Sequence, residues 1–107
     1  MNLKDIKKIK IGYLDYTLEH KRQEEMGGFL GLHERSGVQA TIQVGSETQK
    51  GSELVNTVIH EMLHGVWDEY VLPKDDEERM VSILANGITG LMRDNKELFR
   101  ELLRNLK

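Results

Sequence analysis

The 107-residue sequence contains no cysteine, and proline occurs once. Without cysteine the chain forms no disulfide, offers no thiolate to a metal and has no thiol nucleophile, which fits a reducing compartment. No apolar run is long enough to span a bilayer, and the N-terminus lacks the apolar core of a signal peptide. We therefore expect a cytoplasmic protein with no membrane partner.

The sequence also lacks a basic tract. Its formal net charge is −3, and the lysines near the N-terminus alternate with isoleucines, as on a surface strand. We therefore expect no nucleic-acid partner. A hydrophobic content of 38% and a charged content of 31% are typical of a globular protein. The length allows one hydrophobic core, so residues 1–107 are predicted to form a single domain.

What the sequence does contain is one run of the pattern His-Glu-x-x-His, at residues 60–64. Residues four apart share one face of a helix, so His60 and His64 can both direct a ring nitrogen at one metal ion. Glu61 projects about 100° away around the helix, where it can reach a metal-bound water without ligating the metal. This arrangement is typical of zinc metallopeptidases, in which the glutamate is the general base.

The motif lies in a segment with helical periodicity, expected to begin between residues 46 and 52 and to end near residue 70. On a helical wheel the two histidines border the apolar arc, and the polar side carries Thr57, Glu61 and Asp68. Ser46 with Gln49, or alternatively Ser52, is predicted to cap this helix. The apolar arc is formed by Leu54, Val55, Val58, Ile59, Met62, Leu63, Val66 and Trp67.

The remaining patterns predict an α+β fold, a minimal zincin-like domain with a small, mainly antiparallel sheet packed on two core helices plus a C-terminal helix. Alternation predicts strands at 9–13 and 16–20 and a hairpin of 29–34 with 38–44. A second helix should start after a cap at Asp75 or Asp76. A third should span residues 96–106, capped by Asp94 with Glu97. Gly87 and Gly90 suggest close packing of the second helix on the first.

A catalytic zinc needs a third protein ligand beside the two histidines. Asp68 and Glu69 project away from the histidine pair. Asp75 and Asp76 serve better as helix caps. By helical phase Glu77 points into the middle of the next apolar stripe, whereas Glu78 falls at its edge beside Ala85. We therefore predict Glu78 as the third ligand, with Glu77 as second choice. The alternative for each is a solvated glutamate that stabilises the helix N-terminus.

The motif, followed by an acidic segment and Glu78-Arg79-Met80-Val81-Ser82-Ile83-Leu84-Ala85-Asn86, resembles small zinc metallopeptidase-like proteins of phages and mobile elements. These belong to the ImmA/IrrE type within the zincin superfamily. The resemblance covers roughly residues 29–95. It implies that the glutamate matched by Glu78 is the third ligand. It also implies cleavage of a specific protein partner, such as a repressor.

The expected function is zinc-dependent hydrolysis of peptide bonds, with His60, His64 and Glu78 holding Zn²⁺ and Glu61 activating the water. An open sheet edge would align an extended peptide substrate. Tyr13, Tyr16 and Tyr70 are candidates to stabilise an oxyanion. One alternative is a metal-binding interaction module or inactive pseudo-peptidase that acts by binding a protein. Another is a structural component whose motif is accidental. His20 and His33 are more often structural than ligating in such positions.

Overall fold

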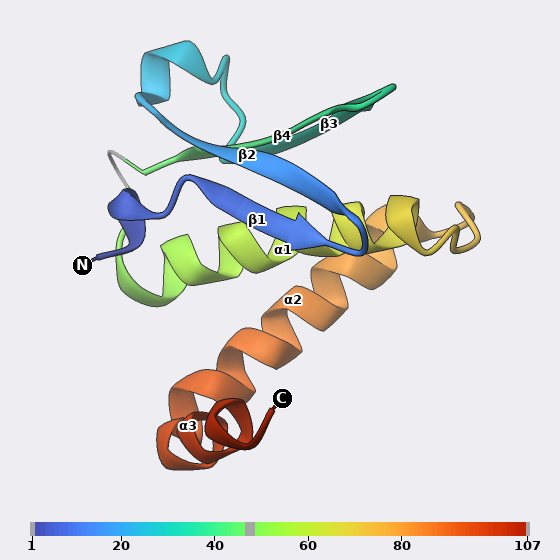
Figure 1. Cartoon of the computed structure of the whole chain (residues 1–107). Coiled ribbons are helices and arrows are strands. Elements are labelled where there is room, and N and C mark those ends of the chain that lie inside the picture. Colours follow the sequence, from blue (N-terminus) through green and yellow to red (C-terminus); the bar gives the residue numbers. More distant parts are fainter. Residues whose placement is uncertain (1, 47–48, 107) are drawn as a thin grey trace.

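A computed structural model describes residues 2–46 and 49–106, and within them the α+β class is confirmed (Figure 1). Four strands form one sheet, and three α-helices follow them in the chain. The strands are β1 (Lys8–Ile11), β2 (Leu14–Lys21), β3 (Gly31–Ser36) and β4 (Gln39–Gly45). The helices are α1 (Gly51–Glu69), α2 (Glu77–Asp94) and α3 (Lys96–Asn105), and two short 3-10 turns span Leu3–Asp5 and Gln23–Glu25.

The sheet has the strand order β1-β2-β4-β3. The pairs β1–β2 and β3–β4 are antiparallel, as predicted for a mainly antiparallel sheet, and the central pair β2–β4 is parallel. The predicted hairpin of residues 29–44 is confirmed as β3–β4, with Gly37 at φ 59° in its turn. Because β4 lies beside β2, strand β3 forms an edge of the sheet next to the motif helix.

The core lies between the sheet and α1 (Figure 1). The alternation predicted for the second hairpin arm is confirmed, because Ala40, Ile42 and Val44 are all buried. Val38, which was assigned to the same face, is 86% exposed because β4 begins one residue later. Helix α2 packs on α1, so that α1 contacts both the sheet and the second helix. The core cluster consists of Ile11, Tyr16, Leu18, Ala40, Ile42, Val44, Leu54 and Val58.

The caps predicted for the first and third helices are wrong, whereas Asp76 is the N-cap residue of the second, as predicted. Helix α1 begins after Lys50, without a side-chain cap, and part of the range expected for its start, residues 47–48, lies outside the described residues. Gln49 is instead buried: its amide donates to the carbonyl oxygens of Leu30 and Gly45, and its side-chain oxygen accepts from the Thr57 hydroxyl. Gln49 therefore ties the start of α1 to the start of β3.

The other two helices also start without a capping side chain. Asp76 is the N-cap residue of α2 but makes no capping bond and adopts a left-handed backbone, φ 60°. Asn95 precedes α3, in place of the predicted Asp94 cap. No described residue of α3 is buried, and its leucines Leu98, Leu102 and Leu103 are exposed. Within the described ranges, no helix combines the length and apolar character needed to cross a membrane.

Close packing of α1 depends on Gly65 and not on the glycines of α2. A Cβ atom built at Gly87 meets no atom within 4 Å, and one at Gly90 meets only a guanidinium nitrogen at 3.6 Å, so the predicted close contact of these glycines is wrong. A Cβ at Gly65 would lie 2.5 Å from Ile11 Cδ1 and 3.4 Å from Tyr16 Cζ. Gly65 therefore lets α1 approach β1 and β2 more closely than any larger residue allows.

We predict that alanine has opposite effects on stability at Gly65 of α1 and at Gly87 of α2. Gly65→Ala should lower the free energy of unfolding by about 1–2 kcal/mol, because overpacking against Ile11 and Tyr16 outweighs the gain in helix propensity. Gly87→Ala should raise it by up to about 1 kcal/mol, because the position is exposed and open. Urea unfolding of both variants beside the wild type measures the difference. Equal stability of the two variants would contradict the packing assigned to Gly65.

Candidate metal centre

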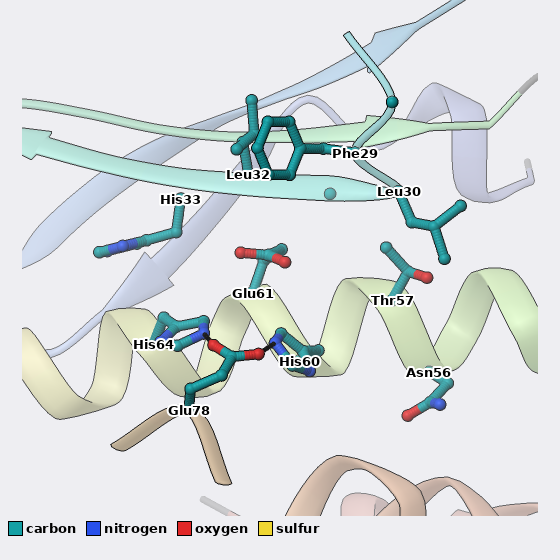
Figure 2. Close-up of a pocket in the computed structure, with 12 residues that line it drawn as sticks. Phe29, Leu30, Leu32, His33, Asn56, Thr57, His60, Glu61, His64 and Glu78 are labelled. Atoms are coloured by element: carbon teal, nitrogen blue, oxygen red, sulfur yellow. Dashed lines mark ion pairs between the residues drawn. The ribbon is translucent and has the colours of Figure 1, made fainter. Parts of the chain in front are cut away.

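The three predicted metal ligands lie together (Figure 2). His60 and His64 project from α1 on successive turns, and Glu78 reaches them from the first turn of α2. Glu78 Oε1 lies 3.0 Å from His60 Nε2, and Glu78 Oε2 lies 2.8 Å from His64 Nε2. One ligand atom from each residue falls within 4.8 Å of the other two. Within the described residues, no other group of three or more such side chains meets this criterion.

Glu78 reaches the histidines because its row of side chains is the one that α2 packs on α1. The buried residues of α2 are Val81, Ala85 and Thr89, which follow Glu78 at helical spacing. Asn56 of α1 fixes the crossing further along, since its amide donates to Asn86 Oδ1 at 2.8 Å. The apolar stripe predicted for α2 was centred on its larger side chains. Several of these are exposed, so the buried row lies elsewhere around the helix. The exposed ones are Met80, Leu84 and Leu91.

The turn between the two helices is short and strained. The N–H of Leu72 donates to the Trp67 oxygen and the N–H of Val71 to the Asp68 oxygen, which is the Schellman pattern that ends a helix. Its left-handed position is occupied by Val71, at φ 52°, where glycine is usual and a β-branched residue is costly. The Trp67 indole also donates to the Pro73 oxygen at 2.8 Å. These bonds direct the chain back so that α2 begins beside His64.

The donor atoms of this cluster fit a divalent cation. Glu77 Oε2 lies 2.6 Å from His64 Nδ1 and Glu78 Oε2 lies 2.8 Å from His64 Nε2, so each ring nitrogen of His64 faces a carboxylate oxygen. When His64 donates from Nδ1 to Glu77, its Nε2 lone pair is available to a cation that Glu78 can also bind. Two imidazole nitrogens and one carboxylate oxygen are a usual zinc donor set, whose atoms lie about 3.3 Å apart in a tetrahedral site. The donor chemistry and the spacing therefore suit Zn²⁺.

Glu61 occupies the wall of the same pocket. The residue is only 7% exposed and lines the pocket, and since no buried side-chain oxygen among the described residues lacks a partner, the carboxylate oxygens of Glu61 reach the open pocket. Burial raises the pKa of Glu61 to about 7; the His64 ring opposes the shift and the Glu78 carboxylate adds to it. A carboxylate with a raised pKa that faces an open pocket has the features of a functional group.

The helical wheel predicted a solvent-facing side of α1 for Thr57 and Glu61. In the structure both side chains lie beneath β3. Gly31 makes the room for them. A Cβ built there would lie 2.8 Å from Thr57 Cγ2 and 2.9 Å from both Glu61 Cγ and Glu61 Oε2. Sequence reasoning treated Gly31 as an ordinary hairpin residue. Glycine inside an apolar strand was the available signal, since it often marks a close approach to another group.

The pocket that holds these groups has a volume of about 600 Å³ and lies between β3 and the two helices. Phe29, Leu30 and Leu32 give it an apolar wall, while Asn56 and Thr57 close one end. Phe29 and Leu30 are more than half exposed, so the apolar wall also forms the rim of the opening. A chain segment entering here would meet apolar side chains first and the carboxylate and imidazole groups at the base.

Strand β3 presents free backbone groups along this pocket. Because the N–H of Gly45 donates to the Leu30 oxygen, the even-numbered residues of β3 are the ones bonded to β4. The N–H and C=O groups of Gly31, His33 and Arg35 therefore point away from β4, on the outer edge of the described sheet. Such an edge can pair with an extended peptide.

The remaining histidines and tyrosines have structural contacts. His33 lines the pocket and lies outside the ligand group, and its Nε2 lies 3.2 Å from Asp68 Oδ2. His20 lies within 3.1 Å of both Ser46 Oγ and the Ile6 oxygen.

No tyrosine lines the pocket, so none is placed to stabilise an oxyanion there. Tyr13 and Tyr70 are exposed. Tyr16 is fully buried, and its hydroxyl donates to Glu69 Oε2 at 2.6 Å. The Arg35 guanidinium donates to the same oxygen, and these two bonds hold the pKa of Glu69 below its usual range.

Comparison of the chain with protein-family models, with curated proteins and with solved structures gave no match.

We predict that natively purified protein contains about one zinc per chain. His60→Ala should abolish the bound zinc, and Glu78→Gln should weaken binding by more than about 100-fold, because each removes a donor atom. Elemental analysis and titration with a competing chelator measure both. Glu97→Gln, on exposed α3, is the matched control for the loss of a glutamate charge. A wild-type protein that neither contains zinc nor takes it up would rule out the metal site.

Gly31→Ala should move Glu61 without changing the metal site. The added methyl group overlaps Glu61 and Thr57, so unfolding should become easier by about 1–3 kcal/mol and the carboxylate should move. Zinc affinity should stay within a few-fold of the wild type, since no ligand is touched. A crystal structure of the variant with Glu61 in its original place would show that Gly31 does not determine its position.

Proposed function

We propose that this protein is a zinc-dependent metallopeptidase, similar to the ImmA/IrrE type of the zincin superfamily, that hydrolyses peptide bonds of a specific protein partner. One observation carries the proposal: a largely buried glutamate, whose carboxylate faces a pocket, adjoins a cluster of two histidines and a glutamate that could hold a metal, and all four line that pocket. A stray motif on a surface helix gives no reason for a third donor to arrive from another helix.

His60, His64 and Glu78 would hold the metal. Bound there, Zn²⁺ would supply Lewis-acid activation of a water molecule and of the scissile carbonyl. Glu61 accepts the proton of the attacking water and delivers it to the nitrogen of the leaving amine. A group that first accepts and then donates works best with a pKa near the operating pH, and burial brings the pKa of Glu61 to about 7.

The edge strand supports a peptide as substrate. An extended segment paired with β3 would exchange hydrogen bonds with the outward backbone groups of Gly31 and His33. It would then run along the pocket in which Glu61 lies. Pairing of this kind requires a segment that can adopt an extended conformation, such as a loop or linker of a folded partner. The substrate expected is therefore an exposed segment of a protein, with a repressor as one candidate.

A second candidate function is a metal-binding interaction module that binds such a segment without cleaving it. It is favoured by the low exposure of Glu61, which lies beneath β3 in contact distance of Gly31. A base so enclosed needs a path for water to the scissile bond. If that path is closed, the same edge strand and pocket would serve for binding alone.

Glu61→Gln tests the two functions against each other. We expect the zinc-loaded wild type to cleave members of a diverse peptide library and Glu61→Gln to be slower by about 100- to 10,000-fold with unchanged zinc content. Mass spectrometry of the digests measures cleavage. Glu53→Gln, on the exposed first turn of α1, is the matched control. Binding of peptides by zinc-loaded wild type without any cleavage would favour the interaction module.

A further inference from the structure

A lysine-centred charge cluster lies directly behind the candidate metal ligands. Lys74, in the turn between α1 and α2, contacts the carboxylates of both Asp68 and Glu77, the latter at 3.4 Å. Each carboxylate uses its other oxygen for a pocket histidine. Glu77 Oε2 lies 2.6 Å from His64 Nδ1, and Asp68 Oδ2 lies 3.2 Å from His33 Nε2. One ammonium group therefore joins two carboxylates, each of which contacts an imidazole.

The contact between Glu77 and His64 has the features of a strong hydrogen bond. The Glu77 side chain is 19% exposed and that of His64 is 14% exposed, so water competes weakly for either group. A short bond from an imidazole N–H to an ionised carboxylate is stronger than one between neutral groups, and more so in such surroundings. When His64 donates from Nδ1 to Glu77, the bond holds the ring orientation and leaves the Nε2 lone pair for a metal on the side of Glu78.

Lys74 offsets the repulsion that this arrangement creates. Asp68 and Glu77 come from different helices and both lie within reach of the same ammonium group. Two neighbouring carboxylates repel each other, and a cation beside both offsets that repulsion. The turn holds Lys74 at this point, because the Pro73 oxygen accepts from the Trp67 indole and the Lys74 oxygen accepts from the N–H of Glu77.

We propose that Glu77 is a positioning residue that fixes His64 as an Nε2 metal ligand, and that Lys74 holds Glu77 in place. The inference rests on the proposed metal site. It assigns different tasks to two adjacent glutamates: Glu78 is a ligand, and Glu77 acts only through His64. Glu77, the second choice for the third ligand, is thus removed from the ligand set by its geometry, because it contacts the ring nitrogen that faces away from Glu78.

The first measurement is the tautomer of His64, read from the long-range ¹H–¹⁵N NMR spectrum of metal-free protein at a pH where its ring is neutral. We expect the wild type to carry the proton on Nδ1. In Glu77→Ala the proton should move to Nε2, where Glu78 accepts it. An unchanged Nδ1 tautomer in Glu77→Ala would overturn the proposal. Circular dichroism establishes that the variant is folded, and Glu77→Gln provides a second, more conservative variant.

The second measurement is zinc affinity by chelator competition. Glu77→Ala should bind zinc about 10- to 100-fold more weakly than the wild type, the usual effect of losing a partner of a ligating histidine. Lys74→Met should weaken zinc binding by only about two- to fivefold, because Lys74 is largely exposed and water screens its charge. The difference from the wild type should shrink as the sodium chloride concentration is raised. Lys74→Arg should restore most of the affinity. Lys96→Met, on exposed α3, is the matched control and should have no effect.

The two measurements separate this inference from the proposed function. If wild-type protein binds zinc and Glu77→Ala binds it equally well, the positioning role is wrong and the metal site stands. If wild-type protein binds no zinc, the proposed function fails, while the tautomer of His64 still decides whether Glu77 orients the ring.

Discussion

Every part of the candidate site depends on helix α1 being packed on two sides at once. One side lies on the sheet, where Gly65 allows close contact with Ile11 and Tyr16, and another side receives α2. A helix with a single partner would leave His60 and His64 at a solvent boundary with no third donor. Because α1 is held between two partners, the histidines stand at the junction where Glu78 arrives from α2 and Glu61 is covered by β3.

The parts of the site that could be predicted are those that depend on helical period alone. The i, i+4 spacing placed His60 and His64 side by side before any partner was known. Strand alternation likewise predicted the buried face of β4. These features need only the geometry of one element, so neighbours in the fold do not alter them.

The parts that could not be predicted depend on which element lies opposite. The helical wheel put Glu61 on a polar side, but β3 covers that side because Gly31 leaves space for the carboxylate. The cap predicted for α1 failed for a similar reason: Gln49 is the residue expected to complete it, yet its amide donates to Leu30 and to Gly45 of β4. A polar residue that can satisfy either a helix end or a neighbouring strand follows the tertiary structure, which a single sequence does not reveal.

Helix geometry explains why the two glutamates at the start of α2 are consecutive in the sequence. Neighbouring helical residues point about 100° apart, so Glu77 and Glu78 diverge and approach different nitrogens of the same His64 ring. The positive end of the helix dipole favours both carboxylates at this position. A pair spaced by three or four residues would lie on one face and could not contact both sides of one imidazole. The adjacent pair therefore couples the orientation of a ligand to the placement of the next ligand, and both follow from where α2 begins.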